Sequence, residues 1–187
     1  MKLTLLLNFS IIMFCCGCNA QTMETVIEKN IKSQFPKAWI GSYQGELSIY
    51  DTDSVKMQVQ MGLDIKKLTD STYTWIISYQ IPEKKDIRAY ELQIVNAKEG
   101  LYQIDEKNGI VLSANYFRGT LVSRFGVGKN LLDILYIKNG QDIHFQVIAG
   151  PRSAEKQEIP EDETLEIFGY EVINYQNAVL QKKTLSN

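Results

Sequence analysis

The sequence predicts an all-β protein, in which antiparallel strands follow one another as a meander and close into a barrel. The stretch VKMQVQMGLDI, residues 55–65, is apolar at every odd position and polar or glycine at every even one. This is the pattern of a strand with one buried face. Similar alternation continues from Trp39 almost to the C-terminus. The connections between alternating segments are too short for the crossover helix that a parallel pair requires, so the sheet is antiparallel.

Residues 1–20 have the composition of a secretory signal peptide. Lys2 is followed by the apolar run LTLLLNFSIIMF and then by CCGCNAQ, which has the small residues of a cleavage region. The apolar run is too short to span a bilayer as a helix. Two processing routes fit. One is ordinary cleavage after Ala20. The other is cleavage after Gly17 with acylation of Cys18, because this segment resembles in part the signal of bacterial lipoproteins.

Either route predicts an exported protein. In a bacterium it would lie in the periplasm or be anchored to the outer membrane as a lipoprotein, and otherwise it would be secreted. All three cysteines, Cys15, Cys16 and Cys18, lie in this leader, so residues 21–187 offer no disulfide, no cysteine nucleophile and no cysteine metal ligand. The net charge is −2, and the sequence gives no sign of the basic face that nucleic-acid binding requires. We expect no nucleic-acid partner, and membrane contact only through an N-terminal lipid anchor.

Residues 21–187 are expected to form one barrel domain that begins with a short helix. Thr25 to Glu28 has the pattern of a capping box, Val26 and Ile27 belong to an apolar helical face, and Pro36 ends the element. This helix is in a position to cover one end of a barrel. The expected strands are 39–51, 55–68, 73–81, 87–95, 101–104, 110–117, 121–127, 131–137, 143–149 and 165–180. Turn signals lie between them, of which the strongest are Asn108-Gly109 and Asn139-Gly140.

Two features favour a closed barrel over a two-sheet sandwich, which remains the alternative. A meander of about ten strands leaves exposed edges unless the sheet closes on itself. The segment 55–68 would also extend for ~40 Å, well beyond the usual strand of ~17–20 Å.

One long connection, residues 150–164, is polar and carries Pro151 and Pro160. It is either a solvated loop or a flap over the mouth of the barrel.

The first strand, WIGSYQGELSIY, resembles the tryptophan–glycine opening strand of the lipocalins and their calycin relatives. It is also similar to the W-x-G-x-G start of the nitrobindin-type haem barrels, and Trp39, Gly41, Tyr43 and Gly45 stand on its alternate positions. The order W-x-G departs from the G-x-W of lipocalins. The resemblance implies a calycin-like barrel of about eight to ten strands that holds a small hydrophobic ligand inside its cup.

Motifs for catalysis are absent, and we assign no catalytic residue and no metal site. The single histidine, His144, excludes sites with two histidine ligands, and there is neither a G-x-S-x-G elbow nor a Walker A loop. His144 falls on the polar parity of its strand and is expected to face solvent. The nitrobindin-like start leaves a haem-ligating role as the alternative, but we expect no cofactor.

Two charged residues have directions that alternation alone leaves undecided. Glu171 lies where both parities are apolar, so it is either an exposed or partnered glutamate or a catalytic one inside the barrel. Arg88 shares its parity with Tyr90 and Leu92. If that face is internal, Arg88 pairs with an anionic head group, and if not it is a surface arginine, which is the preferred interpretation.

Aromatic and methionine side chains on the apolar parity are the candidate ligand-binding residues, because that parity points inward in a barrel. Methionine adapts to irregular apolar shapes, and tyrosine adds a hydroxyl that orients a polar group. Trp39 is assigned a structural role at the closed end. The candidates are Tyr43, Met57, Met61, Trp75, Tyr79, Tyr116 and Phe125.

The leading hypothesis is non-catalytic binding of a small hydrophobic or amphipathic ligand in the cell envelope. A structural or protein-interaction lipoprotein with a packed core is the first alternative, and a barrel enzyme without a known motif is the second.

Overall fold

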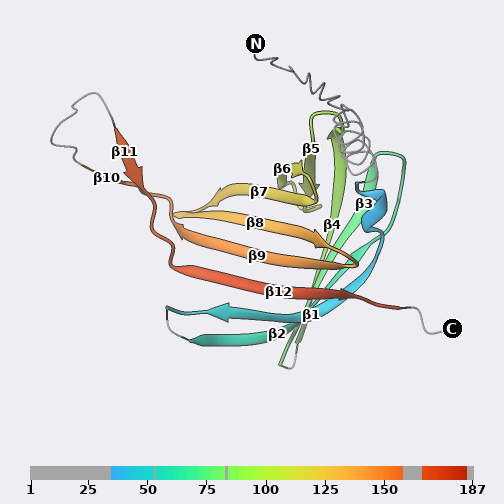
Figure 1. Ribbon diagram of the computed structural model, residues 1–187, viewed down its shortest axis with the longest axis horizontal. Helices are drawn as coiled ribbons and strands as arrows, with labels where there is room; N and C mark the ends of the chain where they lie inside the picture. Colours follow the sequence, from blue (N-terminus) through green and yellow to red (C-terminus); the bar gives the residue numbers. More distant parts are fainter. Residues whose placement is uncertain (1–34, 53, 83, 158–165, 185–187) are drawn as a thin grey trace, which may run out of the picture.

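The computed structural model describes residues 35–52, 54–82, 84–157 and 166–184. The predicted signal peptide, the candidate lipidation site Cys18 and the predicted N-terminal helix lie outside these residues. Within them, ten antiparallel strands form a closed barrel, which confirms the predicted fold class (Figure 1). The barrel strands are β1 Gly41–Tyr50, β2 Val55–Ile65, β3 Thr72–Ile81, β4 Lys84–Asn96, β5 Leu101–Asp105, β6 Val111–Phe117, β7 Thr120–Val127, β8 Asn130–Asn139, β9 Asp142–Pro151 and β12 Asn174–Lys182.

Strands β1 to β9 pair with their neighbours in sequence, and β12 closes the barrel between β9 and β1. A hairpin forms at the predicted signal Asn139-Gly140, but Asn139 is the last residue of β8 and not a central residue of the turn. Asn139 pairs with Asp142, so the two central turn residues of the β8–β9 hairpin are Gly140 and Gln141. Gly140 has a φ of 57°. A glycine at the first central position is what a type II′ hairpin turn requires.

Strand β2 shows that the alternation was interpreted correctly. Val59, Met61, Leu63 and Ile65 are buried, while the even positions point away from the interior. Nearer the start of the strand the odd residues become accessible, and Met57 is 50% exposed. The interior of the barrel is therefore packed at one end and open at the other.

The predicted last strand, 165–180, is wrong as a continuous element. Its first part forms β11 Ile167–Gly169, which pairs with β10 Glu155–Gln157 in a separate two-stranded ribbon. This ribbon projects from the barrel beside the start of β12 (Figure 1). The break was hidden because Phe168, Tyr170 and Val172 make both parities apolar, so alternation carries no boundary there.

The packed end is built on aromatic rings. A short 3₁₀ turn, Lys37–Trp39, precedes β1. Trp39 is 2% exposed, and its ring contacts Phe35 edge-on with centroids 4.8 Å apart. Phe35 also stacks on Tyr116, with centroids 4.2 Å apart. Trp39 thus has the structural position that was predicted for it, as part of the floor of the barrel.

Gly45, the second glycine of the segment WIGSYQG, allows β1 and β12 to close the barrel. A Cβ atom on Gly45 would lie 2.1 Å from the carbonyl oxygen of Val179 in β12. No side chain fits at that distance, so glycine is required by the close approach of the two backbones.

Candidate functional site: a cavity at the open end

The open half of the barrel contains a cavity of about 590 Å³. Volumes of about 300–1,000 Å³ are typical of small-molecule sites. Each barrel strand contributes inward side chains near its open end. The lining residues are Leu47, Ile49, Met57, Val59, Trp75, Ile77, Tyr79, Ile81, Asp86, Arg88, Tyr90, Ile104, Glu106, Ile110, Leu112, Ser123, Phe125, Val127, Leu132, Ile134, Tyr136, Phe145, Val147 and Gln176.

Most of the wall is apolar, and the apolar surface continues to the rim. Met57, Ile81, Ile110 and Val127 line the cavity and are also exposed at the open end. A ligand that enters through this rim meets aliphatic side chains first. Such a path suits a molecule with substantial apolar surface.

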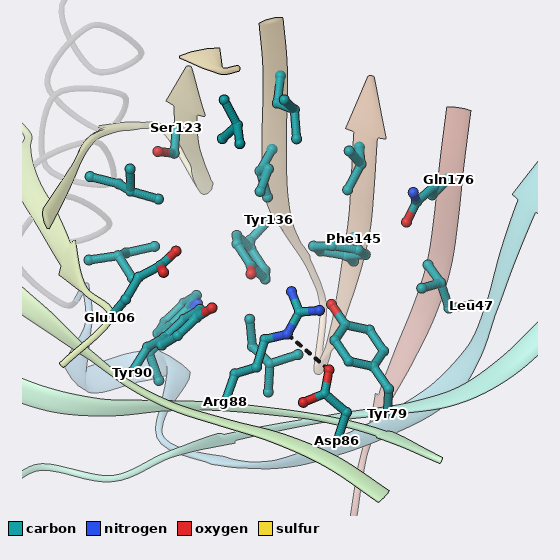
Figure 2. Close-up of a pocket in the computed structure, with 18 of the residues that line it drawn as sticks. Leu47, Tyr79, Asp86, Arg88, Tyr90, Glu106, Ser123, Tyr136, Phe145 and Gln176 are labelled. Carbon is teal, nitrogen blue, oxygen red and sulfur yellow. Dashed lines mark hydrogen bonds and ion pairs between the residues drawn. The ribbon is translucent and has the colours of Figure 1, made fainter. Parts of the chain in front are cut away.

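One side of the cavity is polar and is supplied mainly by β3 and β4. The Arg88 Nε donates to Asp86 Oδ2 at 3.2 Å, and the guanidinium lies 5.0 Å from the ring centroid of Tyr79. Figure 2 shows the guanidinium extending into the cavity between Tyr79 and Tyr90, with one terminal nitrogen on the side of Tyr136 and the other on the side of Tyr79. Asp86 and Tyr79 hold the guanidinium in place, and Tyr90 lies within hydrogen-bonding reach of it, so the arginine is fixed at the polar side of the cavity.

Burial raises the pKa of Tyr79, Tyr90 and Tyr136 above the ordinary value of a tyrosine, so their hydroxyls stay protonated well beyond neutral pH. Arg88 acts in the opposite direction on all three, without reversing the shift. Burial acts to lower the pKa of Arg88 itself, yet its neighbours Tyr79, Tyr90 and Asp86 leave that pKa raised. The guanidinium stays charged.

The inner part of the wall is aromatic. Trp75 is fully buried, and its ring meets Tyr136 edge-on with centroids 5.0 Å apart. The ring of Tyr136 in turn contacts the ring of Phe145, with centroids 5.1 Å apart. The Trp75 Nε1–H has no hydrogen-bond partner among the described residues. Because Trp75 lines the cavity, this buried donor lies beside it.

The seven candidate ligand-binding residues separate into two groups by depth along the barrel axis. Met57, Trp75, Tyr79 and Phe125 line the cavity. Tyr43, Met61 and Tyr116 point inward as predicted but lie in the packed end, where each is buried. Tyr43 donates its hydroxyl to the carbonyl oxygen of Trp39 at 2.9 Å, which is a structural contact.

Arg88 is the principal residue whose preferred interpretation was wrong. It lines the cavity, so its parity on β4 is internal, although its side chain remains 47% exposed because it lies near the mouth. The signal was its alternation with Tyr90 and Leu92. Asp86 on the same parity was not singled out by sequence. Neither was Glu106, which follows β5 and accepts a hydrogen bond from Asn108 Nδ2 at 3.2 Å.

The other charged candidates lie outside the cavity. His144 alternates with Phe145 and lies on the outer face of β9, where its Nε2 is 3.4 Å from Asn139 Nδ2. Glu171 is exposed. The described part of the chain contains no group of three or more histidine, cysteine, aspartate or glutamate residues that could hold a metal ion. It also contains no helix long and apolar enough to cross a membrane.

Comparison with known proteins supports the fold. No family model matches the chain, and no curated protein matches it. Among solved structures, the chain is similar to an S-type phycobiliprotein lyase from Guillardia theta, with 10% sequence identity and a TM-score of 0.60. The match covers 85% of this chain and 98% of the lyase. At this identity the likeness shows a shared barrel fold.

Proposed function

We propose that the protein is an exported, non-catalytic barrel of the calycin type that binds a small hydrophobic or amphipathic ligand in its interior. The observation that carries this proposal is the cavity of about 590 Å³, open at one end and lined mainly by aliphatic and aromatic side chains. Binding would be driven by burial of apolar ligand surface in a largely preformed site, with the polar side fixing orientation.

The shape of the interior supports this function over a packed structural barrel. The floor side chains Leu63, Ile65 and Leu121 are fully buried. The barrel therefore has a well-packed core in one half. The cavity occupies the other half. The structurally similar protein is a phycobiliprotein lyase, so a barrel of this fold is able to carry an activity.

The first experiment is native mass spectrometry of the protein purified from cells, followed by solvent extraction of any bound molecule. Ile134→Trp places a large ring into the cavity from β8, whereas Leu135→Trp places the same ring on the outer face of the same strand. We expect a co-purifying apolar molecule that is lost in Ile134→Trp and retained in Leu135→Trp. Equal retention by both variants would refute binding in the cavity.

Export and lipidation are tested separately. The N-terminal mass of the processed protein distinguishes cleavage after Ala20 from acylation at Cys18, and Cys18→Ala removes only the second route. An intact Met1 on the protein from its native host would refute export.

A second candidate function is protein interaction, favoured by the ribbon β10–β11 and the segment after it. Phe168, Tyr170, Val172 and Ile173 are each about half exposed or more on this projecting region. Exposed apolar clusters of this kind mark interaction surfaces. Self-association of the wild type in solution that is lost in Phe168→Ser and in Tyr170→Ser, with ligand binding intact, would support this role.

A further inference from the structure

The charged residues that line the cavity indicate which ligand charge it accepts. Its lining contains two carboxylates, Asp86 and Glu106, and one guanidinium, Arg88. Negative charge therefore exceeds positive charge by one inside a site whose other walls are mostly apolar. From this arrangement, and resting on the proposed binding function, we infer that the ligand is uncharged and presents a carbonyl-type oxygen to the terminal nitrogens of Arg88.

The donors are provided by Arg88. Its Nε is engaged by Asp86 at 3.2 Å, and the face of Tyr79 lies against the guanidinium at 5.0 Å. The two terminal nitrogens are directed into the cavity (Figure 2). A guanidinium is a donor without acceptor capacity, so the ligand atom opposite it is an acceptor. A carbonyl oxygen of an ester, amide or ketone provides one.

An anionic ligand fits this site poorly. Asp86 already neutralises Arg88, and Glu106 adds a second negative charge close enough to Tyr90 to raise the pKa of that phenol. A ligand carboxylate would be a third negative charge around a single guanidinium. Repulsion between these charges is stronger beside apolar walls than in water. The buried tyrosines report the same environment, since burial disfavours their anionic form.

A cationic ligand is also disfavoured at this position. The ring of Tyr79, which is the aromatic face beside this position, is occupied by the guanidinium of Arg88. A second cation would lie beside that charge. A neutral head group avoids both forms of repulsion, and a neutral tail lies against the aliphatic wall formed by Leu132, Ile134 and Val147.

The test is a matched series of twelve-carbon competitors that displace the neutral fluorescent probe Nile red from the purified protein. The competitors are methyl dodecanoate, dodecanoate, dodecylammonium and dodecane. We expect the ester to bind about tenfold tighter than the other three, a difference of about 1.4 kcal/mol. Dodecanoate binding as tightly as the ester would overturn the inference.

Two variants locate the effect. Arg88→Met should reduce the affinity for the ester to that for dodecane and leave dodecane unchanged. Arg124→Met is the matched control, because Arg124 is paired with Asp133 on the outer face of the barrel. Glu106→Gln should increase the affinity for dodecanoate several-fold. The Glu106→Gln variant provides a second test if Arg88→Met fails to fold. An ester affinity unaffected by Arg88→Met, or a dodecanoate affinity unaffected by Glu106→Gln, would overturn the inference.

These outcomes are distinct from failure of the proposed function. If Nile red and all four competitors fail to bind to the folded protein, the cavity is not a ligand site and both proposals fall. If all competitors bind with equal affinity, apolar binding stands and the neutral carbonyl ligand is refuted.

Discussion

Two methionines on one strand provide a direct test of the division between a packed floor and an open cavity. Met57 and Met61 both point inward from β2, but Met57 is 50% exposed and Met61 is fully buried. We expect Met61→Ala to destabilise the protein strongly and Met57→Ala to do so weakly. Residue type, strand and direction are the same in both variants, so only the depth in the barrel differs.

The magnitudes follow from burial. Replacing a fully buried methionine by alanine removes its transfer free energy and leaves a void, which costs about 2–5 kcal/mol. Met57 keeps half its surface in solvent and already borders the cavity, so its truncation creates no enclosed void. Its loss should cost less than about 1 kcal/mol, in proportion to the apolar area that it buries.

The assay is urea denaturation of both variants beside the wild type, with thermal unfolding as a second measure. For a chain of this size the thermal midpoint falls by about 2–4 °C for each kcal/mol lost. Ligand binding should show the reverse order, since Met57→Ala alters the cavity wall and Met61→Ala does not. Equal destabilisation by the two substitutions would refute the distinction between floor and cavity.

Three further predictions concern the packed end. Gly45→Ala should cost about 1–3 kcal/mol or more, because the new Cβ would lie 2.1 Å from the Val179 oxygen; an unchanged urea midpoint would show that β12 can move aside. Tyr43→Phe removes the 2.9 Å hydrogen bond to the Trp39 carbonyl and should cost about 1–3 kcal/mol, with chemical denaturation as the measurement. Burial raises the pKa of Tyr43 and Tyr102 to about 12 from 10.0, so the folded state resists an ionisation that the unfolded chain undergoes. The free energy of unfolding should therefore be unaffected below pH 10 and fall as the pH rises toward 12, less steeply in Tyr43→Phe with Tyr102→Phe; identical pH profiles would contradict this assignment.

The direction of the side chains could be predicted from sequence, but their depth could not. A period of two residues indicates which face of a strand a side chain lies on. It does not indicate the position of that side chain along the barrel axis. Met61 and Met57 are therefore equivalent in sequence and different in the structure. Depth depends on how far the floor rings around Trp39 reach into the barrel, which is set by tertiary packing.

The polar side of the cavity was harder to predict for a related reason. Charged side chains usually lie on the protein surface, so Arg88 was interpreted as a surface arginine although it shares its parity with Tyr90 and Leu92. Its internal position is compatible with its charge because Asp86 and the face of Tyr79 compensate for part of the lost solvation. That compensation involves the two strands of one hairpin, and no local sequence pattern records it.

The closure of the barrel by β1 and β12 also constrains when the protein can fold. Leu47 pairs with Ala178, so the seam joins the two ends of the folded chain. Until the ribosome has released β12, every earlier strand lacks the enclosure that buries its inner face, and the β1 edge remains unpaired. Such long-range pairing makes folding slow and dependent on completion of the whole chain. Without β12 the barrel cannot close, so the enclosure of the cavity depends on the strand that is made last among those of the barrel.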